Sequence, residues 1–207
     1  MKLYYSETLN PRKVCAVAKY LDTPVEFVHV DLRTGEHRKP AFLSINPNGK
    51  VPVLEDGEKR IWESNAIMGY LAQHAGSDLW PKGDRQIEVL QWLNWDAAHF
   101  TRHASMLYFE YLIKPVLRIG PPNEAVVKDA TSSVLQFGHI LNDHLRGRAY
   151  LVGDLLTIAD FAVAATLPYA ERAHIPIGEF PEVMRWHGRL NEFAAWRDPF
   201  PAIPAAA

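Results

Sequence analysis

Hydrophobic and polar positions in the first 77 residues alternate between the periods of strands and helices. Residues 2–5 and 25–32 are rich in β-branched and aromatic side chains, which predicts two strands. The intervening stretch NPRKVCAVAKYL has apolar residues at helical spacing, with Asn10 as its expected N-cap and Pro11 at its first helical position. This strand–helix–strand order predicts a parallel strand pair with a right-handed crossover.

Further elements complete this first half of the chain. The expected order is strand, strand and helix, at residues 51–55, 59–62 and 64–76. Asp56–Gly57 separates the two strands and is typical of a hairpin turn. Ser64 is the expected helix cap and Gly76 the expected end of the helix. Pro52 is unusual inside a strand, because proline donates no hydrogen bond to a sheet ladder.

From residue 85 onward the apolar positions recur only at helical spacing. The predicted helices cover residues 85–113, 122–146, 157–172 and 180–194. Thr157, followed three residues later by Asp160, has the pattern of a capping box. The change of period near residues 77–84 predicts a small α/β domain, residues 1–77, followed by an all-helical domain, residues 85–207.

Composition and charge exclude several classes of function. The 207 residues carry a net charge of −2 and one short basic cluster, Arg146–Arg148, so we expect no nucleic-acid partner. No apolar run approaches the roughly 18 residues of a membrane span and no signal peptide is recognisable, so we expect a cytoplasmic protein without a membrane partner. Cys15 is the only cysteine, and we interpret it as a packed core residue. His99 and His103 have the spacing of metal ligands on a helix, but no third ligand accompanies them, so we expect no metal.

Two segments carry a resemblance to a known family. NPNGKVPVLEDGEKRIWESNAIMGYL and GDLLTIADFAVA, in this order, resemble the cytosolic glutathione transferase family, with bacterial, theta-like, phi-like and nu-like features. The resemblance implies a thioredoxin-like N-terminal domain, a C-terminal helical bundle and a two-fold symmetric homodimer. It also implies glutathione as the co-substrate.

The resemblance assigns a set of glutathione-binding residues, which are His37, Lys50, Val51, Pro52, Glu63 and Ser64. The first two match positions that hold the glycyl carboxylate in theta-like and phi-like members. In the family the proline is cis, and the residue before it presents its backbone to the cysteinyl part of glutathione. The serine and the helix start suit the γ-glutamyl carboxylate, and the glutamate before it suits the ammonium group. The resemblance also implies an uncommon backbone conformation at this glutamate.

The loop YSETLNPRKV is expected to stabilise the glutathione thiolate, because a free thiol with a pKa of about 8.5 is mostly protonated at neutral pH. Thr8 aligns with the serine of theta-like and phi-like members, and Asn10 with the cysteine of beta-like members. Together with Lys13 they also resemble the loop of the nu class. We expect Thr8 and Asn10 to be the catalytic residues. The alternatives are that Asn10 only caps the helix, that Thr8 is only a loop hydroxyl, or that Ser6 is the donor.

By resemblance, the segment around residues 95–109 lines the site of the second substrate, with Trp95, His99 and His103 as candidates. The expected function is a glutathione transferase of detoxification, which activates the thiol for attack on a small electrophile, apolar or aromatic. Two alternatives stay open. One is a glutathione-dependent disulfide reductase or peroxidase, and the other is a non-catalytic binding or regulatory scaffold with the same fold.

Overall fold

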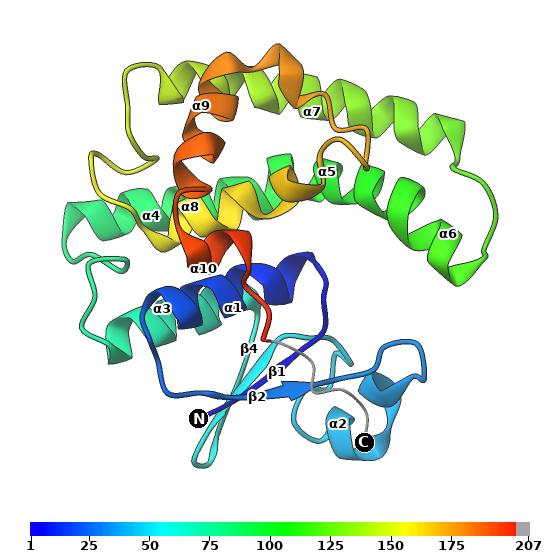
Figure 1. The fold of residues 1–207 in the computed structure, drawn as a ribbon, viewed down its shortest axis with the longest axis vertical. Coiled ribbons are helices and arrows are strands. Elements are labelled where there is room, and N and C mark those ends of the chain that lie inside the picture. The colour runs from blue at the N-terminus through cyan, green and yellow to red at the C-terminus, as the bar shows by residue number, and fades with distance from the viewer. Residues whose placement is uncertain (202–207) are drawn as a thin grey trace. The chain divides into compact units, whose positions relative to one another are not determined.

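The computed structural model describes residues 1–201 and falls into two compact units (Figure 1). The first unit comprises residues 1–77 together with the described residues from Glu192 onward, and the second comprises Asp78–Asn191. The predicted division assigned the C-terminal segment to the helical domain. The structure instead groups it with the first unit, because α10 (Ala194–Arg197) packs on α1 (Leu9–Tyr20).

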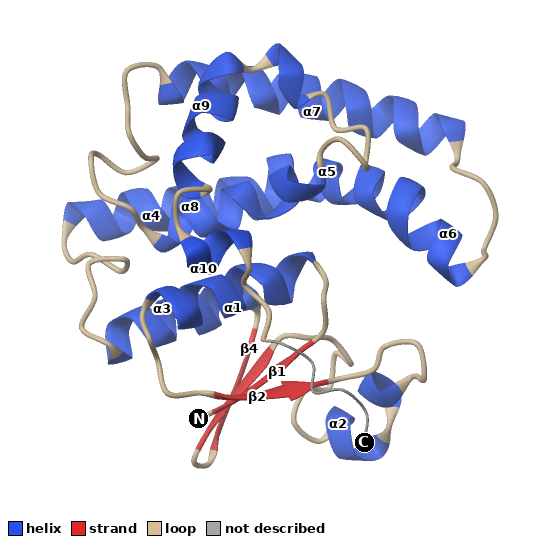
Figure 2. Ribbon diagram, in the orientation of Figure 1, coloured by secondary structure: helices blue, strands red, loops and turns tan. Residues whose placement is uncertain are grey.

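The first unit is built on a mixed sheet, whose strands are red in Figure 2, and the order of the strands is β2-β1-β3-β4. The strands are β1 (Lys2–Tyr5), β2 (Glu26–His29), β3 (Val53–Asp56) and β4 (Lys59–Trp62). β1 pairs parallel with β2, and β3 pairs antiparallel with both β1 and β4. All the predicted strands are present, and β3 begins at Val53 rather than at residue 51, directly after the proline that cannot donate to the ladder.

Helices cover the sheet of the first unit. α1 and α3 (Ser64–His74) pack against each other and bury Val14, Val17 and Leu71. Two short helices that the sequence did not predict, η1 (Glu36–Arg38) and α2 (Pro40–Leu43), connect β2 to β3. Phe42 of α2 packs in a small core cluster with Val30 and Val53. This arrangement confirms the predicted thioredoxin-like fold class.

The start of α1 differs from the prediction. Thr8, not Asn10, is the N-cap, with an extended backbone at φ −130° and ψ 171°. Its carbonyl accepts the first helical hydrogen bond, from the N–H of Arg12 at 3.0 Å. Pro11 therefore occupies the third helical position, which tolerates proline because the N–H groups of the first turn have no partner inside the helix.

The second unit is helical throughout its regular elements. They are α4 (Asp84–Trp95), η2 (Asp96–Phe100), α5 (Thr101–Tyr108), η3 (Phe109–Ile113), α6 (Lys114–Leu117), α7 (Glu124–Leu145), α8 (Ile158–Val163), η4 (Ala164–Tyr169), η5 (Ile177–Glu179) and α9 (Pro181–Leu190). The predicted helix 85–113 is thus interrupted by the two π-helical turns η2 and η3. No helix among residues 1–201 is long and apolar enough to span a membrane.

The predicted capping box stabilises the start of α8. The Asp160 carboxylate, fully buried, accepts hydrogen bonds from the Thr157 N–H at 2.9 Å, the Leu151 N–H at 2.9 Å and the Trp186 indole N–H at 3.0 Å. Burial nevertheless outweighs these bonds and raises the pKa of Asp160 to about 6. The capping box therefore places the ionisable Asp160 carboxyl group among the buried residues of the helical unit.

Candidate active site

The topology of the first unit brings the predicted glutathione-binding segments to one end of the sheet. β1 and β4 are both antiparallel to β3, so they run in the same direction. α1 follows β1 and α3 follows β4, so both helices begin at the carboxyl ends of these strands. β3 runs the other way and begins there too, with Val53 paired to Tyr4. The β1–α1 loop, the Val51–Pro52 pair and the start of α3 therefore share one edge.

The starts of α1 and α3 are in direct contact. The Ser64 hydroxyl donates a hydrogen bond to Oδ1 of Asn10 at 3.3 Å. Lys13 is only 3% exposed, and its ammonium group donates to Oδ1 of Asn65 at 2.9 Å. Helix N-termini carry N–H groups without intrahelical partners and the positive end of the helix dipole. Two such ends side by side form a place suited to two negative groups of one ligand.

The β1–α1 loop presents the predicted sulfur-contacting residues. Among the described residues, the half-buried Thr8 side chain caps no backbone N–H of its helix. The Thr8 N–H donates to the carbonyl of Ser6 at 2.7 Å, which closes the loop tightly. Asn10 is exposed and contacts Ser64, whereas the Ser6 side chain is buried. Thr8 and Asn10 are thus available to a ligand at the start of α1.

The bond between Val51 and Pro52 is cis. Pro52 is buried and Val51 half-buried, and the residue pairs of β3 with its neighbours begin only at Val53. The carbonyl of the preceding Lys50 accepts a hydrogen bond from the Asn46 side chain at 2.7 Å, which anchors the chain just before the proline. Val51 therefore lies beyond the end of the ladder, where an extended peptide can pair with its backbone.

Glu63 has a strained backbone at the start of α3. Its φ is 69° and its ψ 115°, a region that non-glycine residues rarely adopt. Such a conformation costs on the order of 1–3 kcal/mol and is found preferentially at functional sites. The uncommon backbone expected from the resemblance is confirmed, and the exposed Glu63 side chain precedes Ser64.

Gly49 allows the segment that carries His37 and the segment that leads to Lys50 to approach each other. Gly49 has φ 60°, and a Cβ at this position would lie 3.2 Å from the carbonyl oxygen of His37. Any larger residue would push the η1 turn away from the segment that leads to Lys50. Within residues 1–201, the buried Nδ1 of His37 has no hydrogen-bond partner. Lys50 is exposed.

Trp95, His99 and His103 lie on one helical face and contact the ring of Phe137 in α7. Their ring centroids are 6.3, 4.7 and 5.8 Å from it, respectively. Burial, and next the charge of Arg102, lower the pKa of His103. Packing inside the helical unit accounts for these positions. The predicted role of the three residues in the acceptor site stays a prediction.

Two other features lie outside the candidate site. Cys15 is fully buried, and burial raises the pKa of its thiol to about 12, so it is protonated and inaccessible at neutral pH.

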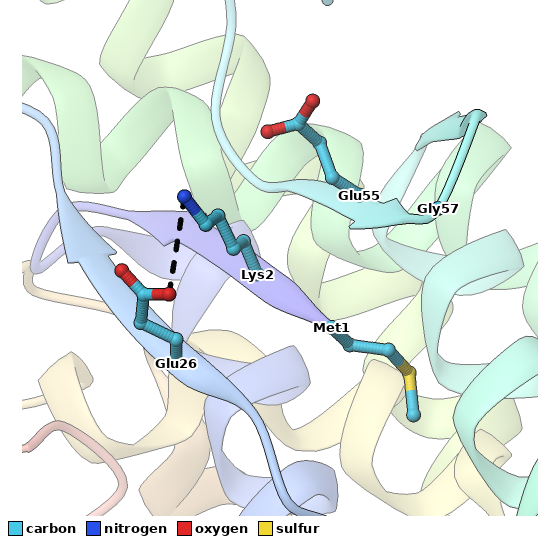
Figure 3. A pocket seen from close by; sticks show the side chains of 5 residues that line it. All are labelled: Met1, Lys2, Glu26, Glu55 and Gly57. Atoms are coloured by element: carbon cyan, nitrogen blue, oxygen red, sulfur yellow. Dashed lines mark ion pairs between the residues drawn. The ribbon is translucent and has the colours of Figure 1, made fainter.

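A pocket of about 370 Å³ is lined by Met1, Lys2, Glu26, Glu55 and Gly57 (Figure 3). These residues lie at the opposite end of β1 from the β1–α1 loop. In the part of the chain that the structure describes, no three His, Cys, Asp or Glu side chains cluster as metal ligands.

The structure also places residues near the site that sequence reasoning did not assign to it. Asn65 receives the Lys13 hydrogen bond, although the two residues are 52 positions apart. Gly49 determines the approach of His37. A contact between distant segments leaves no local pattern, so no feature of the sequence indicated that Asn65 lies at the site. The glycine in NPNGK was visible in the sequence, but its neighbour in space was not.

Comparisons with known proteins agree with this description. Residues 1–73 match the model of the glutathione S-transferase N-terminal domain, and residues 100–193 match that of the C-terminal domain. Glutathione S-transferase 3 of Zea mays is 34% identical over 209 residues, which cover 97% of this chain and 93% of that protein. The fold and site define a thioredoxin-like domain joined to a helical domain. The chain belongs to the glutathione S-transferase family.

Solved structures give the same result. The crystal structure of glutathione transferase F7 from Populus trichocarpa superposes with a TM-score of 0.89, at 25% identity, and covers 96% of each chain. Glutathione S-transferase I from mais, in complex with an atrazine glutathione conjugate, has a TM-score of 0.86 at 26% identity, with 96% of this chain and 95% of that chain covered. The predicted transferase function is confirmed by these relatives. The finer bacterial, theta-like and nu-like features are not supported by the plant proteins that match.

Proposed function

We propose that this chain is a phi-like glutathione transferase in which Thr8 and Asn10 hold the glutathione sulfur. The observation that carries the proposal is the contact between the starts of α1 and α3, made by Ser64 and Asn10 at 3.3 Å. The sulfur then lies at the positive end of α1 and the γ-glutamyl carboxylate at that of α3. The F designation of the Populus relative supports the phi-like assignment.

The remaining parts of glutathione fit the other residues at this sheet edge. The Glu63 carboxylate suits the γ-glutamyl ammonium, and the Val51 backbone extends the sheet to the cysteinyl residue. His37 and Lys50 suit the glycyl carboxylate, because Gly49 lets their segments approach each other. Residues 1–77 accordingly contain the glutathione-binding residues, and the helical residues 85–191 supply the acceptor site.

The reaction follows from an ionised thiol held beside an electrophile. The thiol loses its proton to solvent water, with the resulting negative charge stabilised by the Thr8 hydroxyl, the Asn10 amide and the N–H groups of α1. The sulfur lone pair then forms a bond to the electrophilic carbon, and the leaving group departs with the electrons of its own bond. An apolar or aromatic electrophile is the expected acceptor, since the relative from mais is in complex with a glutathione conjugate of atrazine.

Kinetics with an activated aryl chloride test the mechanism. Losing one hydrogen bond to a charged group costs about 1.5–3 kcal/mol, so Thr8→Ala and Asn10→Ala should each lower kcat by about tenfold to a hundredfold. Thr8→Ser keeps the hydroxyl and should keep turnover. If Ser6→Ala abolished activity while Thr8→Ala did nothing, the sulfur assignment would be overturned. Activity with hydroperoxides or mixed disulfides, but none with the aryl chloride, would favour the reductase or peroxidase alternative.

We also propose a cytoplasmic homodimer. Trp62 of β4 and Ile87 of α4 are 42% and 64% exposed in the single chain, which leaves large apolar side chains for a partner surface. The unpaired, buried Cys15 is typical of a protein from a reducing compartment. Sedimentation equilibrium at micromolar concentration should give twice the chain mass of 23.5 kDa, and a monomer would contradict the proposal.

A further inference from the structure

The C-terminal strap, defined here as residues 193–200, runs along α1 within the first unit. The Arg12 guanidinium donates to the carbonyl of Trp196 at 2.6 Å and lies 5.1 Å from the centroid of its ring. Trp196 is fully buried and Arg12 is 7% exposed. The strap is therefore anchored on α1 in the same turn that follows the sulfur-contacting loop.

A second anchor lies at the other end of α1. The Lys19 ammonium donates to the carbonyls of Asp198 and Phe200, at 2.8 and 2.7 Å. The ring of Phe193 meets that of Tyr20 edge-on, with centroids 5.4 Å apart. Because Arg12 and Lys19 are seven residues apart, they lie on one face of the helix. The strap thus contacts α1 near both ends.

The strap also reaches the strand that precedes the loop. The ring of Phe200 stacks on that of Tyr5, with centroids 6.0 Å apart and an interplanar angle of 17°. Tyr5 is the last residue of β1 and is 2% exposed. The loop Ser6–Thr8 therefore runs between two points that the strap contacts, Tyr5 before it and Arg12 after it.

We propose that the C-terminal strap positions the start of α1 against the glutathione sulfur, with Lys19 and Phe200 as positioning residues. The inference rests on the proposed function. The helix end and the loop donors stabilise a thiolate only when they are aligned with it, and a shift of about 1 Å can cost about a hundredfold in rate. Residues far along the chain then adjust the ionisation of the bound thiol without touching it. Glutathione affinity through α3 does not depend on them.

The test compares Lys19→Met and Phe200→Ala with the unaltered protein. Absorbance of the thiolate against pH gives the pKa of bound glutathione, and we expect each variant to raise it by about 0.5–1 unit. At a pH below that pKa, kcat of each variant should be about three- to tenfold lower than kcat of the unaltered protein. The reason is that a rise of one unit in the thiol pKa lowers the thiolate fraction about tenfold. The loss should disappear at a pH where the thiol is ionised in all variants. KM for glutathione should stay within about twofold.

The controls separate positioning from general stability. Lys128→Met makes the same change at an exposed lysine of α7 and should leave the pKa of bound glutathione unchanged. Phe200→Tyr keeps the stacked ring and should restore the original pH profile. Should Phe200→Ala unfold the chain, Phe200→Leu removes the ring more mildly and gives the same readout. An unchanged thiol pKa in folded Lys19→Met and Phe200 variants would overturn the inference. Absence of a thiolate signal in the unaltered protein would instead overturn the proposed function.

Discussion

Replacing Ser64 by alanine isolates one contact of the proposed glutathione site. The Ser64 side chain is 8% exposed and its hydroxyl donates to Asn10 at 3.3 Å. Binding exchanges this neutral hydrogen bond, worth about 0.5–1.5 kcal/mol, for one to a carboxylate, worth about 1.5–3 kcal/mol. The net loss on removing the hydroxyl is therefore about 1–2 kcal/mol. Ser64→Ala should raise the Kd for glutathione by about five- to thirtyfold.

Calorimetric titration with two ligands makes this prediction specific. Glutathione carries the γ-glutamyl carboxylate, and the dipeptide cysteinylglycine lacks it, so Ser64→Ala should weaken only the first. Ser64→Thr keeps a hydroxyl and should retain most of the affinity. Ser44→Ala removes an exposed hydroxyl that bonds the carbonyl of Ala41 in the same unit, and it should change neither Kd.

Two results would refute the reasoning. An unchanged Kd for glutathione in Ser64→Ala would mean that the start of α3 does not receive the carboxylate. An equal loss of affinity for the dipeptide would mean that the substitution distorts the whole sheet edge, rather than removing one contact. The circular dichroism and the urea midpoint of the variant distinguish this second case from simple unfolding.

Three further predictions concern the core. Cys15→Ala should leave turnover nearly unchanged, and the native Cys15 thiol should resist alkylation until the chain unfolds, because burial raises its pKa to about 12. A Cβ on Gly138 would lie 2.3 Å from the Phe180 ring. Gly138→Ala should therefore lower the free energy of unfolding, measured by urea titration, by about 1–3 kcal/mol or more. The control Gly188→Ala places its Cβ in open space and should lower the free energy of unfolding little or raise it. The folded-state pKa of Asp160 is raised to about 6 from 3.8, so the folded state binds the proton more tightly. The free energy of unfolding should therefore fall by about 2–3 kcal/mol as the pH rises from about 4 to 6. Asp160→Asn should remove this dependence on pH.

The sequence predicted elements whose side chains repeat a simple period. The strands and α3 fall close to the predicted ranges, because alternation and helical spacing depend on local burial alone. η1 and α2 are too short to show a period, and the sequence did not predict them. The π-helical turns η2 and η3 within the predicted helix 85–113 depend on how it packs, which no local pattern records.

The candidate site was predictable where a motif fixes the backbone. Pro52 and Glu63 lie in a recognisable segment, and both have the unusual backbone that the resemblance implied. The cap of α1 was placed at Asn10 rather than Thr8, because both side chains are good N-caps and Pro11 fits either choice. The anchoring of the C-terminal strap on α1 could not be predicted, because it joins residues more than 170 positions apart.

The direction of the strands explains why residues so far apart in sequence can serve one ligand. Two parallel-running strands, β1 and β4, each lead into a helix, and the antiparallel β3 between them starts at the same edge. The starts of two helices and the backbone segment that precedes Val53 therefore meet at this edge of the sheet. Under the proposed function, much of the stabilisation of the thiolate comes from the N–H groups of α1. We infer that a threonine and an asparagine can therefore occupy this loop in place of a serine, while the proposed glutathione-binding edge keeps its geometry.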